Sequence, residues 1–139
     1  MRSATDGSGV MVRLDDGEDL LESLRRVASD HGVHSGCVVF GIGQLKDFEL
    51  GYFDGREYKR KTFAEAHELV GLHGTITLNS DPPLHVHAAV SAGDFVLKGG
   101  HLFRATVATV GEVYIQKLPR IQMTRESDSR DGLRKLALG

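Results

Sequence analysis

The chain has 139 residues, of which 40% are hydrophobic and 26% are charged, as in one ordinary globular domain spanning residues 1–139. Its formal net charge of −2 does not fit a surface coated with cations for nucleic-acid phosphates. The single cysteine, Cys37, excludes a disulfide within the chain, no apolar run is long enough to span a bilayer and no signal peptide opens the sequence, so we expect a cytoplasmic protein that does not enter a membrane.

The first third of the chain predicts a tail, a strand and a helix. We expect residues 1–8 to form a polar N-terminal tail and residues 10–14 a strand. Asp15 and Asp16 provide an N-cap for a helix over residues 17–31. The apolar side chains of that helix fall on one stripe, which indicates a core-facing surface: Leu20, Leu21, Leu24, Val27 and Ala28. Gly32 is suited to end the helix.

The middle of the chain predicts four strands, over residues 35–42, 48–54, 57–63 and 68–78. Gly41, Ile42 and Gly43 are expected to break the first of them with a tight turn, and no phosphate-binding glycine motif is present there. Asp54 and Gly55 form a strong hairpin turn between the second and third strands.

The last part of the chain predicts a proline-containing loop, a hairpin and two further strands. The loop covers residues 79–83, the hairpin begins at residue 84, and the later strands cover residues 105–110 and 112–117. Residues 124–139 are expected to form a polar C-terminal tail. One main helix and about seven strands joined mostly as hairpins predict a compact α+β fold with a mostly antiparallel sheet.

Three of the seven histidines, His85, His87 and His101, gather in the predicted hairpin. Residues two apart in a strand share a face, so His85 and His87 point to the same side. A loop at residues 92–94 pairs His85 with His101, and a loop at residues 91–93 shifts the pairing by two. Both place His101 on that face, whereas a two-residue loop places it on the other. Three imidazoles on one face can hold a divalent metal ion, and zinc is the first expectation.

Gly99 and Gly100 precede the third histidine and are expected to shape the site, because a side chain there would crowd it or keep two backbones apart. The alternative interpretation is that the three histidines are ordinary surface or core residues. An HxH pair alone is common on the solvent face of strands. A third histidine in a compatible register favours a metal site over that alternative.

Several motifs in order resemble the plant and prokaryote conserved family, also called PPC or DUF296. His85-Val86-His87-Ala88 and Gly99-Gly100-His101-Leu102 resemble its HxHA strand and the GGHL segment that follows. Residues 67–76 resemble its glutamate-containing strand, residues 41–43 its glycine turn and residues 50–54 the strand after that turn. The resemblance runs from about residue 9 to residue 138. It implies a compact α+β domain that assembles as a homotrimer.

Glu68 lies in one of the segments that carry the resemblance, and it is the candidate for a further role at the metal. It can complete the metal's shell, hydrogen-bond a ligating imidazole, or act as a general acid or base. The alternative is a solvent-facing carboxylate, and the resemblance favours a buried or interface position. His31, His34, His67 and His73 are predicted not to bind metal, with His67 exposed at a strand edge and His73 structural.

Two functions from different classes follow from these observations. The resemblance implies a regulatory trimer, and the family is described as DNA-binding because plant members join this domain to AT-hooks. This chain has no Arg-Gly-Arg-Pro core and a negative net charge, so it is of the prokaryotic type without an AT-hook, and its partner is DNA or another protein. The alternative is a zinc-dependent enzyme similar to acetolactate decarboxylase, acting on a small acid whose carbonyl or carboxylate oxygen the metal polarises.

Overall fold

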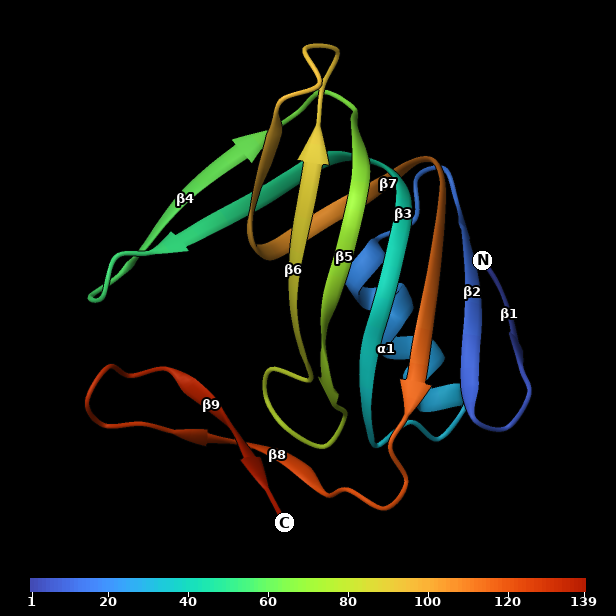
Figure 1. Cartoon of the computed structure of the whole chain (residues 1–139), viewed down its shortest axis with the longest axis vertical. Helices are drawn as coiled ribbons and strands as arrows, with labels where there is room; N and C mark the ends of the chain where they lie inside the picture. The colour runs from blue at the N-terminus through green and yellow to red at the C-terminus, as the bar shows by residue number, and fades with distance from the viewer.

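The structure, a computed structural model, describes all 139 residues as nine strands and one helix (Figure 1). The helix is α1 (Leu20–Asp30), and the strands are β1 (Arg2–Thr5), β2 (Gly9–Asp15), β3 (Ser35–Phe53), β4 (Tyr58–Phe63), β5 (His67–Thr77), β6 (Leu84–Ser91), β7 (Leu97–Lys117), β8 (Met123–Ser127) and β9 (Arg134–Leu138). No helix in the structure has both the length and the apolar character needed to cross a membrane.

Seven of the strands form one antiparallel sheet in the order β1-β2-β7-β6-β5-β3-β4, and β8 and β9 form a separate two-stranded sheet. The first half of β3 pairs with β5 and with the second half of β7, while its second half pairs with β4 and with the first half of β7. The two long strands therefore meet twice, and the sheet curls around its core. The prediction of a mostly antiparallel sheet of about seven strands with one helix is confirmed.

The helix begins later than predicted. Its N-cap is Asp19, whose carboxylate accepts a hydrogen bond from the backbone N–H of Glu22 at 2.9 Å. Asp15, predicted as part of the cap, instead contacts the amino group of Met1 at 3.0 Å together with Glu18 at 2.8 Å. The carboxylates of Asp15 and Glu18 bind the N-terminal amino group, and Asp19 is the acidic residue that caps the helix. The helix ends as predicted at Gly32, which has a φ of +63°.

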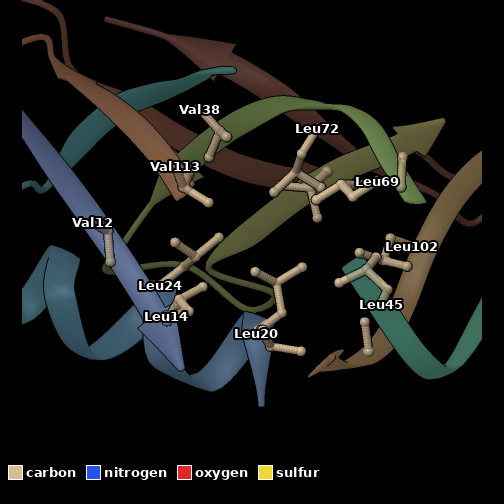
Figure 2. Packing of buried hydrophobic residues seen from close by; sticks show 14 of the residues in the cluster. Val12, Leu14, Leu20, Leu24, Val38, Leu45, Leu69, Leu72, Leu102 and Val113 are labelled. Carbon is tan, nitrogen blue, oxygen red and sulfur yellow. The ribbon is translucent and has the colours of Figure 1, made fainter. Parts of the chain in front are cut away.

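The core lies between α1 and the concave side of the sheet. Figure 2 shows leucine side chains of the helix, among them Leu20 and Leu24, pointing toward side chains of the strands. The cluster holds 23 buried residues, and burying each leucine or valine contributes about 1.5–3 kcal/mol. Phe48 is fully buried and stacks on Phe63 with ring centroids 4.9 Å apart. One face of the sheet is thus covered by the helix.

The glycine turn predicted at residues 41–43 is instead an irregularity within one continuous strand, β3. Gly43 has a φ of +137°, and the pairing of β3 with β7 shifts register between Gly43 and Gln44. A left-handed glycine that keeps its ladder partners produces a bulge, not a chain reversal. The two strands predicted over residues 105–117 are likewise one strand, because β7 is continuous through Gly111.

Both predicted tails contain strands. In the N-terminal tail, β1 pairs with β2 from Arg2 opposite Arg13 to Thr5 opposite Val10. In the C-terminal tail, β8 and β9 form a hairpin that lies below the ends of β5 and β6 in Figure 1. The hairpin is tied to the main sheet because the backbone N–H groups of Met123 and Arg125 donate to the hydroxyls of Ser35 and Ser80, each at 3.0 Å. The sequences of β1, β8 and β9 do not show the alternation of apolar and polar residues that predicts a strand. Their pairing therefore could not be predicted from the sequence.

Candidate metal centre

The three histidines come from two neighbouring strands. His85 and His87 lie on β6, and His101 lies on β7 directly opposite His87. The loop between the strands covers residues 92–96, so Ser91 pairs with Leu97. Both predicted registers were wrong, since neither pairs His101 with His87, but the shift from each is an even number of residues. The structure therefore brings His101 to the predicted face.

The spacing of the imidazoles fits a metal ion. One ring nitrogen from each histidine lies within 4.8 Å of those of the other two. The Nε2 atoms of His85 and His87 are 3.3 Å apart. Two ligands of a tetrahedral zinc ion with bonds of about 2.1 Å are about 3.4 Å apart. In addition, Nδ1 of His101 is buried and has no hydrogen-bond partner, as expected of an imidazole whose partner is a metal ion and not a protein group.

Electrostatics keep these rings ready to bind a cation. Burial lowers the pKa of His101 to about 4, and the neighbouring His85, His87 and Arg60 act in the same direction. Burial also lowers the pKa of His85, with smaller contributions from Arg125 and His87. Both imidazoles are therefore neutral at pH 7 and offer their lone pairs to a metal ion. A metal ion that binds a protonated imidazole must first displace its proton, and here that step is not needed.

Gly99 and Gly100 lie where the backbone of β7 approaches its neighbouring strands closely. A Cβ on Gly100 would lie 2.6 Å from the carbonyl oxygen of Gly51 on β3, and one on Gly99 would lie 2.8 Å from that of Ala88 on β6. Both positions therefore need glycine for the close approach of neighbouring strands. That approach sets the position of His101 between β6 and β3.

The structure does not bring Glu68 to the three histidines. Glu68 is exposed on β5 opposite Ser91, and its carboxylate accepts a hydrogen bond from the side chain of Gln44. The residue of β5 that faces His85 is Thr75, seven positions along the strand or about 23 Å away. Within one chain, Glu68 is neither a ligand of the tripod nor a hydrogen-bond partner of its imidazoles.

The remaining histidines contribute no ligand atom to the cluster, although His73 lies on β5 directly opposite His87. Nδ1 of His73 lies 2.8 Å from the carbonyl oxygen of Val39. His67 was predicted to be exposed, but only 8% of its surface is accessible because its ring packs edge-on against Phe48 and Phe63. The prediction was wrong because His67 begins β5 between the ring of Phe63, four residues before it, and that of Phe48, which is distant in sequence.

A family model of the Plants and Prokaryotes Conserved (PCC) domain matches residues 1–119. The chain belongs to the PCC family. This is the family named PPC or DUF296 above, so the resemblance of the motifs is confirmed. No curated protein matches the chain. The family model ends before β8, and the C-terminal hairpin of this PCC protein lies outside the matched residues.

Solved structures of similar proteins share the fold. A metal-containing protein from Archaeoglobus fulgidus is 28% identical, with a TM-score of 0.84 over 98% of this chain and 95% of that chain. A plant- and prokaryote-conserved protein from Pyrococcus horikoshii is 26% identical, with a TM-score of 0.81 over 96% and 93% of the two chains. A "Putative DNA-binding protein" from Ralstonia eutropha JMP134 is 25% identical, with a TM-score of 0.86 over 99% and 96%.

A pocket of about 540 Å³ opens beside the tripod of this PCC domain. His85 and His101 form one side of it, and the aromatic rings of Tyr58 and Phe103 line it as well. Much of the remaining wall comes from the C-terminal hairpin, through Arg125, Gly132, Leu133, Arg134, Lys135 and Leu136. Sequence reasoning missed these residues, because a polar segment with scattered arginines is indistinguishable from a solvated tail.

Proposed function

We propose that this PCC-domain protein binds one divalent metal ion, zinc, through His85, His87 and His101, and presents it to a small molecule in the adjoining pocket. The observation that carries the proposal is the convergence of three imidazoles, two of which line that pocket. The metal-containing relative from Archaeoglobus fulgidus, 28% identical, supports it. Three imidazole nitrogen ligands favour zinc among the common divalent ions.

Three protein ligands leave one coordination position open, which is the arrangement of catalytic zinc and not of structural zinc. A zinc ion bound there supplies a Lewis acid able to polarise a carbonyl or carboxylate oxygen. The chain's own residues hold the ligands in place. The β6–β7 ladder keeps His87 opposite His101. The close approach of Gly100 to Gly51 sets the distance of the neighbouring His101 from β3. A zinc-dependent enzyme acting on a small acid is the form of this function that the pocket supports.

The proposal includes assembly as a homotrimer. The sheet face opposite α1 carries exposed apolar residues, among them Val39, Ile42 and Val70 with 45%, 47% and 51% of their surfaces accessible. One helix covers only the other face, so subunit contacts supply the cover that these strands need. Light scattering should give three times the 15.1 kDa chain mass at micromolar concentration, and a monomer mass would contradict the trimer.

DNA binding is the second candidate, and one surface favours it. Lys59, Lys61 and Lys98 line a shallow groove that also contains Tyr52, 70% of whose surface is accessible. Lysines beside an exposed aromatic ring can contact phosphates and stack a base. Two of the lysines already pair with carboxylates, Lys59 with Asp54 at 3.4 Å and Lys98 with Asp94 at 3.8 Å. Because these carboxylates reduce the positive charge that phosphates would meet, DNA binding is the second candidate. Binding of a single-stranded oligonucleotide that weakens steeply from 50 to 200 mM salt would support it.

Zinc titration of the metal-free protein against a chromophoric chelator tests the metal centre. We expect one zinc ion per chain. His101→Ala should reduce the affinity by more than about 100-fold, because even groups that only orient a ligand contribute 10- to 100-fold. The matched control is His31→Ala, on the helix C-cap, which should bind zinc as the parent does. Equal zinc affinity in His101→Ala and the parent, with both folded by circular dichroism, would reject the site.

A further inference from the structure

The side chain of Arg125 has an unusual environment for a cation. Only 6% of the residue is accessible, its Nε is buried without a hydrogen-bond partner, and Nη2 donates to the hydroxyl of Thr75. It forms no ion pair with any carboxylate. A buried guanidinium with an unused donor is costly unless an anion completes it. Burial also lowers the pKa of Arg125, which reflects the same cost.

The pocket that Arg125 lines carries an excess of positive charge. Three of its lining residues are cations, Arg125, Arg134 and Lys135, and none is acidic. Lys135 is already neutralised by Asp128 at 2.7 Å and Asp131 at 2.6 Å. Arg134 donates only to neutral oxygens, the hydroxyl of Ser127 and the backbone carbonyl of Arg125. Two guanidinium groups therefore remain without a carboxylate.

The other walls of the pocket are largely apolar. Tyr58 and Phe103 pack edge to face with centroids 5.0 Å apart, and Leu133 and Leu136 lie on the hairpin side. The volume of about 540 Å³ is that of a site for a small molecule. A molecule that fits these walls has a carbon body and one anionic end.

We propose that the pocket binds a small organic carboxylate, whose anionic group pairs with Arg125 and Arg134 while its carbon body contacts the aromatic wall. The planar guanidinium matches the two oxygens of a carboxylate. Phosphate shares this chemistry, but its double charge would call on Lys135, which the two aspartates already hold. The inference names the ligand class of the proposed metal centre and rests on it, because His85 and His101 line the same pocket.

The C-terminal hairpin thus has a role in recognition. It delivers Arg125 from β8 and Arg134 from β9 to the pocket, where Arg125 is bonded to Thr75, the cross-strand neighbour of His85, and both arginines lie beyond the part of the chain that the family model matches. The histidines lie within the residues that the family model matches, and in this proposal the hairpin selects which molecules reach them.

Isothermal titration of the zinc-loaded full chain with benzoate, lactate, benzamide and inorganic phosphate tests the inference. We expect at least one carboxylate to bind, and benzoate to bind more tightly than benzamide. Arg125→Met should weaken the carboxylate about 10- to 100-fold while keeping one zinc ion per chain. Arg134→Met, at an exposed site on β9, should weaken it in the same direction. The matched control is Arg120→Met, an exposed arginine outside the pocket, which should bind as the parent does.

The outcomes separate this inference from the metal proposal. Zinc binding with no carboxylate binding at 10 mM, or equal carboxylate affinity in the parent and both Arg125→Met and Arg134→Met, overturns the inference and leaves the metal centre standing. Tighter binding of inorganic phosphate than of either carboxylate overturns the choice of ligand class. Carboxylate binding that depends on Arg125 in a protein that takes up no zinc would overturn the metal centre and leave the inference standing.

Discussion

Replacing Gly100 with alanine should damage both the stability of the fold and the metal centre. The new Cβ would lie 2.6 Å from the carbonyl oxygen of Gly51, about 0.8 Å short of the usual carbon–oxygen contact of about 3.4 Å. Neither strand can move freely, because Gly100 also pairs with Ala88 on the other side. Forcing such a group into a packed sheet costs about 1–3 kcal/mol. With a slope of about 2 kcal/mol per molar urea, the unfolding midpoint should fall by about 0.5–1.5 M.

The measurement is urea unfolding in the presence of a chelator, so that zinc does not contribute, at one fixed protein concentration. Gly93→Ala is the matched control, because a Cβ there has no atom within 4 Å, and it should change the stability by less than about 0.5 kcal/mol. Zinc affinity of Gly100→Ala should also fall by about 10-fold or more, since the displaced backbone carries His101 with it. An unfolding midpoint equal to that of the parent would refute the claim that strand approach at Gly100 positions the tripod.

Three further changes test other parts of the structure. Asp19→Ala should lower the free energy of unfolding by about 0.5–2 kcal/mol, measured by urea titration, because it removes the helix cap. Metal-free protein should lose stability as pH falls from about 6.5 to 4, since burial lowers the pKa of His101 to about 4 and the unfolded chain takes up that proton first; His101→Ala should reduce the difference between urea midpoints at pH 7 and pH 5. Ile42→Glu, at an exposed apolar side chain, should reduce the mass in light scattering from that of the proposed trimer to that of a folded monomer, and an unchanged trimer mass would contradict the proposed contact at Ile42.

The sequence predicts the tripod because hairpin loops of three and of five residues place His101 on the same face. His85 and His87 share a face in any strand, and every hairpin loop with an odd number of residues brings His101 to it. The loop length itself could not be predicted, since it depends on Phe95, a non-glycine residue with a φ of +59°. Such a conformation is rare outside glycine, asparagine and aspartate, and no pattern in the sequence announces it.

The parts that could not be predicted depend on contacts between residues distant in sequence. A register shift in β5 between Leu69 and Gly71 changes which residues share a face, so the position of Glu68 could not be derived by counting from His73. Arg125 is buried because Thr75 and the hairpin surround it, while its neighbours in sequence are polar. A buried arginine within a polar segment has the same sequence pattern as an exposed one.

We propose above all that His85, His87 and His101 hold one metal ion. The most direct test is a crystal structure of the zinc-loaded protein with an anomalous difference map at the zinc edge. We predict one strong peak per chain, within about 2.1 Å of one nitrogen from each of the three imidazoles. A map with no peak among these rings, or with its peak at other residues, would contradict the account.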